Sequence, residues 1–353
     1  MCEIRQEKTR CLELNYMNAL GCLLVILIHV LSVGIVTVDP ASWQGTVVFI
    51  PWQLAGFVVP MFLFTGGVKM SLHFGDRPIS LRTYWQYIGQ RFLKVYLPYV
   101  LWTLVYCAVY LHFQMIQCTP RQLLGHLLAG TMSSQFYYII LLMQFYILMP
   151  FWMKLAQKLS PYIAICGGLM LSLLMVRMSN LLHLLEIDFP YADRFFVGYA
   201  LYWILGLYVG LHYDIIYGYI KEKRGHPLLS LVLIFVFVGI AYARFVTDVH
   251  IFDLNYVKIL SDILSIFLLF YICVLVKEGT FLQRILGFVH KSSLSVYLSH
   301  CLFLEVAAYF LSSAGVFKLA AILPIRALVC YTIPFALYWG YQKATRLIKR
   351  RRM

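Results

Sequence analysis

Long runs of apolar residues, each about 20 residues in length, follow one another along the chain with short polar connections. A run of this length crosses the hydrocarbon core of a bilayer as one α-helix. Strands of an outer-membrane barrel would instead alternate apolar and polar residues over about 10 positions, a pattern that these runs lack. The sequence therefore predicts an all-α bundle of about ten transmembrane spans, over residues 14–36, 47–70, 92–113, 136–153, 162–182, 195–213, 227–246, 259–276, 293–312 and 319–342.

Three prolines fall inside these predicted spans and are expected to distort them. Pro60, Pro98 and Pro334 lie in the second, third and tenth spans. Each proline lacks a backbone N–H donor, so we expect a kink at each position. Neighbouring helices allow such breaks within a membrane.

The composition agrees with a membrane protein. Hydrophobic residues make up 62% of the chain and charged residues only 12%. Soluble domains average about 45–50% apolar and about 25% charged residues. The composition therefore excludes an ordinary soluble enzyme and a disordered chain.

The distribution of lysine and arginine predicts the orientation. When the ten spans alternate sides, most of the 29 basic residues fall on the side of the N-terminus. The positive-inside rule then places both termini in the cytoplasm. We expect a cytoplasmic segment at residues 1–13, a membrane domain at 14–345 and a basic cytoplasmic tail at 346–353. The net charge of +14 mostly reflects this topology, so the expected partner is the lipid bilayer and no nucleic acid partner is expected.

The chemistry must take place within the bundle or at its rims. The longest connections, near 114–135 and 178–194, are too short to hold a separate catalytic domain. The nine cysteines are scattered, and no pair has the spacing of a metal site. We therefore expect neither a bound metal nor a disulfide framework.

Two histidines lie inside predicted spans, where an ionisable group is costly and is a functional candidate. His29 is placed beyond the membrane midplane, toward the outer leaflet, and its sequence neighbours are apolar. A neutral imidazole there suits a general base, although a hydrogen-bonded packing histidine is the alternative. His300 is placed nearer the cytoplasmic side, and the same alternative applies to it.

Charged residues in the spans divide into a structural pair and a candidate anion site. Glu305 and Arg326 have equal depth in the last two predicted spans, so we expect a structural ion pair that fixes this hairpin. Arg91 and Lys94, three residues apart, are expected to share a helix face at the cytoplasmic mouth. Together with Arg82 they are suited to bind phosphate, although positive-inside anchoring explains them equally well.

Several motifs follow one another along the predicted spans. They include a first span that ends in His29, an Arg-x-x-Lys motif with a following proline, and a Ser-x-Tyr-Leu-x-His motif. The segments are Leu14–His29, Val59–Gly66, Arg91–Tyr99, Phe136–Pro150, Leu205–Gly210 and Ser295–His300. Together they resemble the acyltransferase 3 family of integral membrane proteins, over essentially all ten spans. Within that family the nearest likeness is to the O-acyltransferases of the intercellular adhesin type.

The chain departs from the pattern of this family at three positions. Asn18 stands where the family usually has a cation, eleven residues before the histidine of the first span. Lys94 replaces an arginine, which keeps the charge but loses the bidentate geometry. Thr65 precedes Gly66 where the family has serine. These departures point to a different acyl donor or to reduced activity.

The resemblance implies an O-acyltransferase of the cell membrane that uses acyl-coenzyme A as a co-substrate and holds no permanent cofactor. An acetyl or succinyl group would pass to a hydroxyl of an extracytoplasmic glycan, with glycan synthase or export proteins as further partners. His29 would act as general base and His300 would position the donor or support the oxyanion. The family further implies donor binding by Arg91, Lys94, Arg82 and Asn18.

Two other functions fit the same sequence features. An exopolysaccharide exporter or flippase also needs about ten spans, broken helices and a basic cytoplasmic face. A catalytically silent binding or sensing member of the family is the second alternative, because Asn18 carries no charge. Loss of glycan acylation without loss of export, on substitution of His29, would separate an enzyme from an exporter.

Overall fold

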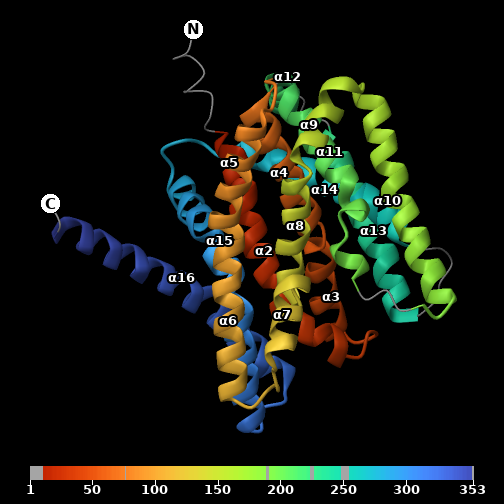
Figure 1. The fold of residues 1–353 in the computed structure, drawn as a ribbon. Coiled ribbons are helices and arrows are strands. Elements are labelled where there is room, and N and C mark those ends of the chain that lie inside the picture. Colours follow the sequence, from red (N-terminus) through yellow and green to blue (C-terminus); the bar gives the residue numbers. More distant parts are fainter. Residues whose placement is uncertain (1–10, 76, 188–190, 223–225, 248–253, 352–353) are drawn as a thin grey trace.

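The protein is a bundle of α-helices, in which the described residues form no β-strand (Figure 1). The computed structural model describes residues 11–75, 77–187, 191–222, 226–247 and 254–351. Its α-helices are α2 (Leu12–Thr37), α3 (Trp43–Ala55), α4 (Val58–Phe74), α5 (Leu81–Arg91), α6 (Leu97–His112), α7 (Pro120–Ala129), α8 (Tyr137–Ile147), α9 (Met149–Lys158), α10 (Pro161–Leu184), α11 (Ala200–Leu211), α12 (Tyr213–Glu222), α13 (His226–Thr247), α14 (Leu254–Val274), α15 (Phe281–Ser313) and α16 (Leu319–Arg351).

The number of membrane spans agrees with the sequence. In the described part of the chain, eight helical segments are long and apolar enough to cross a membrane. Two bent pairs, α8 with α9 and α11 with α12, pass the same test together, and the number rises to ten if each pair is one span. The pairs bend by 58° and 93°, so each is a broken span or a re-entrant segment. The prediction of an all-α, multi-pass bundle is confirmed.

Two of the three prolines coincide with irregular backbone. Gly56 and Phe57 separate α3 from α4, and Pro60 follows in the first turn of α4. Because Pro60 has no N–H, the carbonyl of Gly56 loses its helical partner and is free for another donor. Pro98 follows a π-helix at Phe92–Tyr96, in which the N–H of Leu97 bonds the carbonyl of Phe92. The helix α16 continues through Pro334.

The helices α4 and α11 pack with their backbones in contact. An added Cβ at Gly206 would lie 2.1 Å from the carbonyl oxygen of Phe64, and one at Gly67 would lie 2.4 Å from that of Trp203. At Gly210 it would lie 2.6 Å from the carbonyl oxygen of Val68. Glycine at these positions allows close approach, as small residues commonly do between membrane helices.

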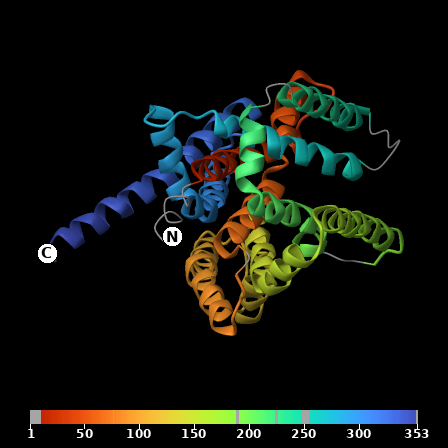
Figure 2. The same ribbon diagram turned by 90° about the horizontal axis from the view of Figure 1, so that it is seen from above.

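The helix α2, which carries His29, lies against several neighbouring helices. It packs against α3, α4, α14, α15 and α16. Figure 2 shows α2 in red next to the blue helices near the end of the chain. The dark blue end of α16 leaves the bundle and extends to Arg351 (Figures 1 and 2). Of the predicted terminal segments, residues 1–10 and 352–353 lie outside the described residues.

Candidate functional site

The fold brings the two candidate histidines together. The ring of His29, on α2, lies 5.2 Å from the ring of His300, on α15, measured between centroids. The predicted difference in their depth is therefore wrong. The reason is that α15 starts at Phe281, twelve residues before the predicted start of that span, so His300 lies far along the helix.

The imidazole of His300 is buried and its hydrogen bonds fix its tautomer. Its Nδ1 lies 2.9 Å from the carbonyl oxygen of Tyr297 and 3.1 Å from that of Val296. Both partners are acceptors, so Nδ1 carries the proton and Nε2 keeps its lone pair. That Nε2 lies 3.3 Å from the thiol of Cys301. A neutral His300 therefore has no free N–H to offer an oxyanion.

His29 is held through its backbone and leaves its ring available. Arg326 donates from a terminal nitrogen to the carbonyl of His29 at 3.0 Å, and from Nε to that of Val30 at 3.3 Å. The ring Nδ1 lies 3.5 Å from the hydroxyl of Ser134. When Nδ1 carries the proton toward Ser134, Nε2 holds the lone pair that a general base needs.

The predicted ion pair between Glu305 and Arg326 is not formed. These two side chains make no salt bridge in the described structure, although their charges still attract each other. The guanidinium reaches across to α2 and binds the two carbonyls instead, because it satisfies its donors there. Arg326 thus fixes the backbone at His29 and not the hairpin of α15 and α16.

A group of possible metal ligands also forms here. The ligand atoms of His29, His300 and Cys301 lie within 4.8 Å of one another. Nitrogen and thiolate ligands of this kind suit Zn²⁺. Sequence spacing did not reveal the group, because tertiary packing brings α2 and α15 together. In the structure the lone pair of His300 Nε2 faces the Cys301 thiol, so His29 holds the most available nitrogen.

A buried polar network fixes the segment that carries Ser134. The amide of Gln135 donates to the hydroxyl of Tyr106 at 2.9 Å. The hydroxyl of Tyr297 donates to the backbone carbonyl of Gln135. These bonds tie the short helix Ser134–Phe136 to α6 and α15, so the position of Ser134 beside His29 is well defined.

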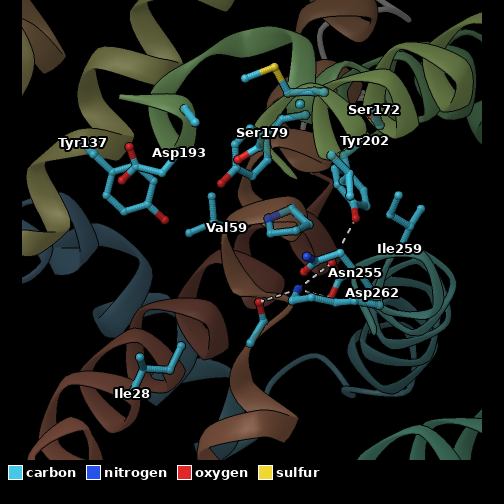
Figure 3. A pocket seen from close by; sticks show the side chains of 18 of the residues that line it. Ile28, Val59, Tyr137, Ser172, Ser179, Asp193, Tyr202, Asn255, Ile259 and Asp262 are labelled. Atoms are coloured by element: carbon cyan, nitrogen blue, oxygen red, sulfur yellow. Dashed lines mark hydrogen bonds and ion pairs between the residues drawn. The ribbon is translucent and has the colours of Figure 1, made fainter. Parts of the chain in front are cut away.

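A cavity of about 660 Å³ includes His29 in its lining. Figure 3 shows this cavity from close by. Helices α2, α4, α10, α11 and α14 contribute residues to its walls. Most of these residues lie near loops that we predict on the outer side of the membrane. In Figure 3, Tyr137 and Asp193 lie on one side of this cavity, and Tyr202 and Asp262 lie on the other. Its aromatic and polar lining includes Trp52, Gln53, Gln135, Tyr137, Ser172, Ser179, Asn180, Asp193, Tyr199, Tyr202, Asn255, Lys258, Asp262 and Tyr297.

A charged network in this cavity was missed by the sequence analysis. Lys258 donates to both carboxylate oxygens of Asp262, at 2.7 and 2.8 Å, and Tyr202 donates to the same group at 2.9 Å. Lys258 also lies 3.4 Å from the carbonyl oxygen of Gly56, the acceptor that Pro60 leaves free. The available signal was a pair of opposite charges four residues apart inside an apolar span.

The three basic residues predicted to bind phosphate, Arg82, Arg91 and Lys94, do not lie together on one helix face. Arg91 is half-buried, and its guanidinium lies over the rings of Tyr87 at 4.7 Å and Tyr146 at 5.1 Å. Lys94 and Arg82 are exposed. The π-helix after Arg91 widens the turn, so residues three apart no longer align as an α-helix would align them. Of the three, only Arg91 faces the interior.

Asn18 occupies a polar position between α2 and α4. Its side-chain oxygen accepts a hydrogen bond from the hydroxyl of Thr65 at 2.9 Å. This contact joins the residues at two of the three sequence departures noted above. It lies eleven residues before His29, roughly 16 Å along the axis of α2 at 1.5 Å per residue.

Comparison with known proteins gives one match. Residues 12–339 match the family model described as an acyltransferase domain, which therefore covers α2 to α15 and most of α16. No curated protein and no solved structure matches the chain.

Proposed function

This chain belongs to the acyltransferase 3 family, and on that premise we propose that it moves an acyl group from acyl-coenzyme A to a hydroxyl of an extracytoplasmic glycan. Family membership makes it a multi-pass membrane acyltransferase. The donor, the acceptor and the plasma membrane location are our proposals. The observation that carries them is the position of His29, whose ring faces both the outer cavity and His300.

The lining of the outer cavity supports a sugar as acceptor. Aromatic rings such as Trp52 and Tyr199 offer flat apolar faces, while Gln53 and Asp193 offer hydrogen-bonding groups. A small number of polar groups among apolar walls is typical of a small-ligand site. Hydroxyl-rich rings of a poly-N-acetylglucosamine or a related exopolysaccharide have the matching chemistry.

The proposed reaction uses His29 as general base. The acceptor hydroxyl oxygen attacks the thioester carbon while His29 takes the hydroxyl proton. The C–S bond then breaks, its electron pair leaves on the sulfur, and His29 returns the proton to that thiolate. The products are an ester on the glycan and free coenzyme A.

His300 fits a positioning role in this reaction. Its Nδ1–H is occupied by two backbone carbonyls and its Nε2 faces Cys301. It therefore supports the ring of His29 by packing at 5.2 Å and does not donate to the oxyanion. The hydroxyl of Ser134, near His29, is the better oxyanion donor.

The first functional prediction concerns the outer cavity. Substituting Asp262→Asn leaves Lys258 without its counter-ion and disturbs the cavity wall, so we expect the KM for the glycan acceptor to rise about tenfold. The KM for the acyl donor stays within about twofold, because the donor approaches from the other end. Steady-state kinetics with each substrate varied in turn measures both values.

A matched control for this variant is Glu278→Gln, an exposed carboxylate at the opposite end of the bundle. It removes the same charge and is expected to leave both KM values unchanged. Equal effects of Asp262→Asn on the two KM values would argue against an acceptor site in this cavity.

The proposed function is tested by titrating the detergent-purified protein with coenzyme A, acetyl-coenzyme A and succinyl-coenzyme A. We expect saturable binding and slow release of free thiol from one of the two thioesters, which identifies the acyl group. A folded protein that binds none of the three compounds would refute the proposal and favour a glycan exporter.

A further inference from the structure

A second group of basic side chains, distinct from the histidine pair, converges at the end of the bundle that we place in the cytoplasm. It consists of Lys69 on α4, Arg91 on α5 and His290 on α15, and we call it the basic triad. Its members come from three different helices. The sequence analysis singled out neither Lys69 nor His290.

The contacts of α2 explain why these helices converge. Thr65 on α4 donates to Asn18 at 2.9 Å, and Cys22 on α2 donates to the carbonyl of Ser293 on α15 at 3.8 Å. Asn18 and Cys22 are four residues apart and share one face of α2. Both neighbouring helices are therefore fixed to the same short stretch of α2.

One helical turn away from these contacts, α4 and α15 each carry a basic residue. Lys69 follows Thr65 by four residues, and His290 precedes Ser293 by three. Because α4 and α15 run in opposite directions, both steps lead toward the same end of the bundle. Lys69 is close enough to His290 and to Arg91 for their charges to interact.

Some polar atoms of the basic triad have no hydrogen-bond partner among the described residues. Lys69 is half-buried and makes no hydrogen bond or ion pair with any described residue. The Nε of Arg91 and the Nδ1 of His290 are buried without a hydrogen-bond partner among the described residues. Buried donors without acceptors are costly, and an anionic ligand would satisfy them.

Two aromatic rings flank the guanidinium of Arg91. Tyr87 and Tyr146 flank the cation at 4.7 and 5.1 Å. Such contacts are compatible with a second, charged partner on the free edge of the guanidinium.

We propose that Lys69, together with Arg91 and His290, binds the phosphate groups of the coenzyme A donor, and that Lys69 supplies the cation that Asn18 does not. This inference rests on the proposed function and assigns a specific donor-binding residue to it. Asn18 then holds α4 in register through Thr65 and does not contact the phosphates. The stretch of α2 between Asn18 and His29 runs alongside the path of the flexible arm of coenzyme A.

The test measures equilibrium binding of coenzyme A and of pantetheine, which lacks the phosphates, to the purified full-length protein. We expect Lys69→Gln to weaken coenzyme A binding about tenfold and to leave pantetheine binding unchanged. Lys69→Arg keeps the charge and is expected to stay within about threefold of wild type. The matched control is Lys158→Gln, which removes an exposed charge in the last turn of α9 and should have no effect.

The outcomes separate this inference from the proposed function. If wild type binds coenzyme A and Lys69→Gln binds it equally well, the role of Lys69 is refuted and the acyltransferase proposal stands. If wild type binds no coenzyme A at all, both are refuted.

A lipid phosphate is the other source of such an anion, and a competition experiment tests it. If phosphatidylglycerol vesicles bind through Lys69 while coenzyme A binding is unaffected by Lys69→Gln, the triad is a lipid headgroup site and our inference is overturned. If Lys69→Gln weakens coenzyme A binding and added phosphatidylglycerol leaves wild-type coenzyme A binding unchanged, the inference is supported.

Discussion

Replacement of His29 by alanine is expected to lower the turnover number about 10²–10⁴-fold and to leave the KM for the acyl donor near its wild-type value. This range is the typical contribution of a general base. We propose that the donor binds at the opposite end of the bundle, so we expect its affinity not to depend on the imidazole. Release of free coenzyme A from acetyl- or succinyl-coenzyme A, with glycan acceptor present, gives both constants.

Two further variants separate proton transfer from a structural role of this histidine. His29→Gln keeps a polar side chain but no basic nitrogen, so we expect it to be as inactive as His29→Ala. The control is His112→Ala, which removes an exposed histidine at the end of α6. Thermal unfolding midpoints close to wild type show that the variants are folded. A His29→Gln variant with near-normal turnover would rule out the proposed base.

Of all the substitutions proposed for this protein, Gly206→Ala is expected to give the largest loss of stability. The added Cβ would lie 2.1 Å from the carbonyl oxygen of Phe64, which is backbone and cannot move aside. The helices α4 and α11 must then separate. Overpacking typically costs about 1–3 kcal/mol, and we expect a value at or above the top of this range.

The matched control for this prediction is Gly239→Ala on α13, where an added Cβ meets open space within 4 Å. Alanine there is expected to be neutral or slightly stabilising, because it has the higher helix propensity. Thermal unfolding in detergent, followed by size-exclusion chromatography, compares the two variants. Equal midpoints for Gly206→Ala and Gly239→Ala would contradict the close packing of α4 and α11.

The spans were predictable because their signal is local. Runs of apolar residues long enough to cross a bilayer give the helices directly, and Pro60 marked the break after α3. The positions of helix ends were less predictable. The helix that carries His300 starts earlier than its apolar run, because the more polar residues before that run continue the same helix. That shift placed His300 at the wrong depth in the prediction.

The contacts of the site depend on tertiary packing that the sequence does not display. Arg326 and Glu305 have similar depth, yet the guanidinium binds carbonyls of α2, a helix about 300 residues away. Lys94 follows Arg91 by three residues, yet the π-helix between them changes its direction. Spacing rules assume regular helices and neighbouring partners, and both assumptions fail here.

The charged network in the cavity beside His29 illustrates a signal that was present but unused. Lys258 and Asp262 are four residues apart in an apolar helix, a spacing that predicts a local pair. Their importance follows only from the fold, which places Tyr202 and the free carbonyl of Gly56 around them. Opposite charges at helical spacing inside a span therefore merit the same attention as a lone histidine.

The central claim is acyl transfer across the membrane from a cytoplasmic donor to an outer acceptor. It is tested most directly in proteoliposomes of the full-length protein, with isotope-labelled acyl-coenzyme A on one face and N-acetylglucosamine oligosaccharides on the other. Mass spectrometry of the oligosaccharides is expected to show a labelled ester on a hydroxyl, formed by wild type and absent with His29→Ala. Oligosaccharides that cross the bilayer without gaining a label would contradict the account and identify an exporter.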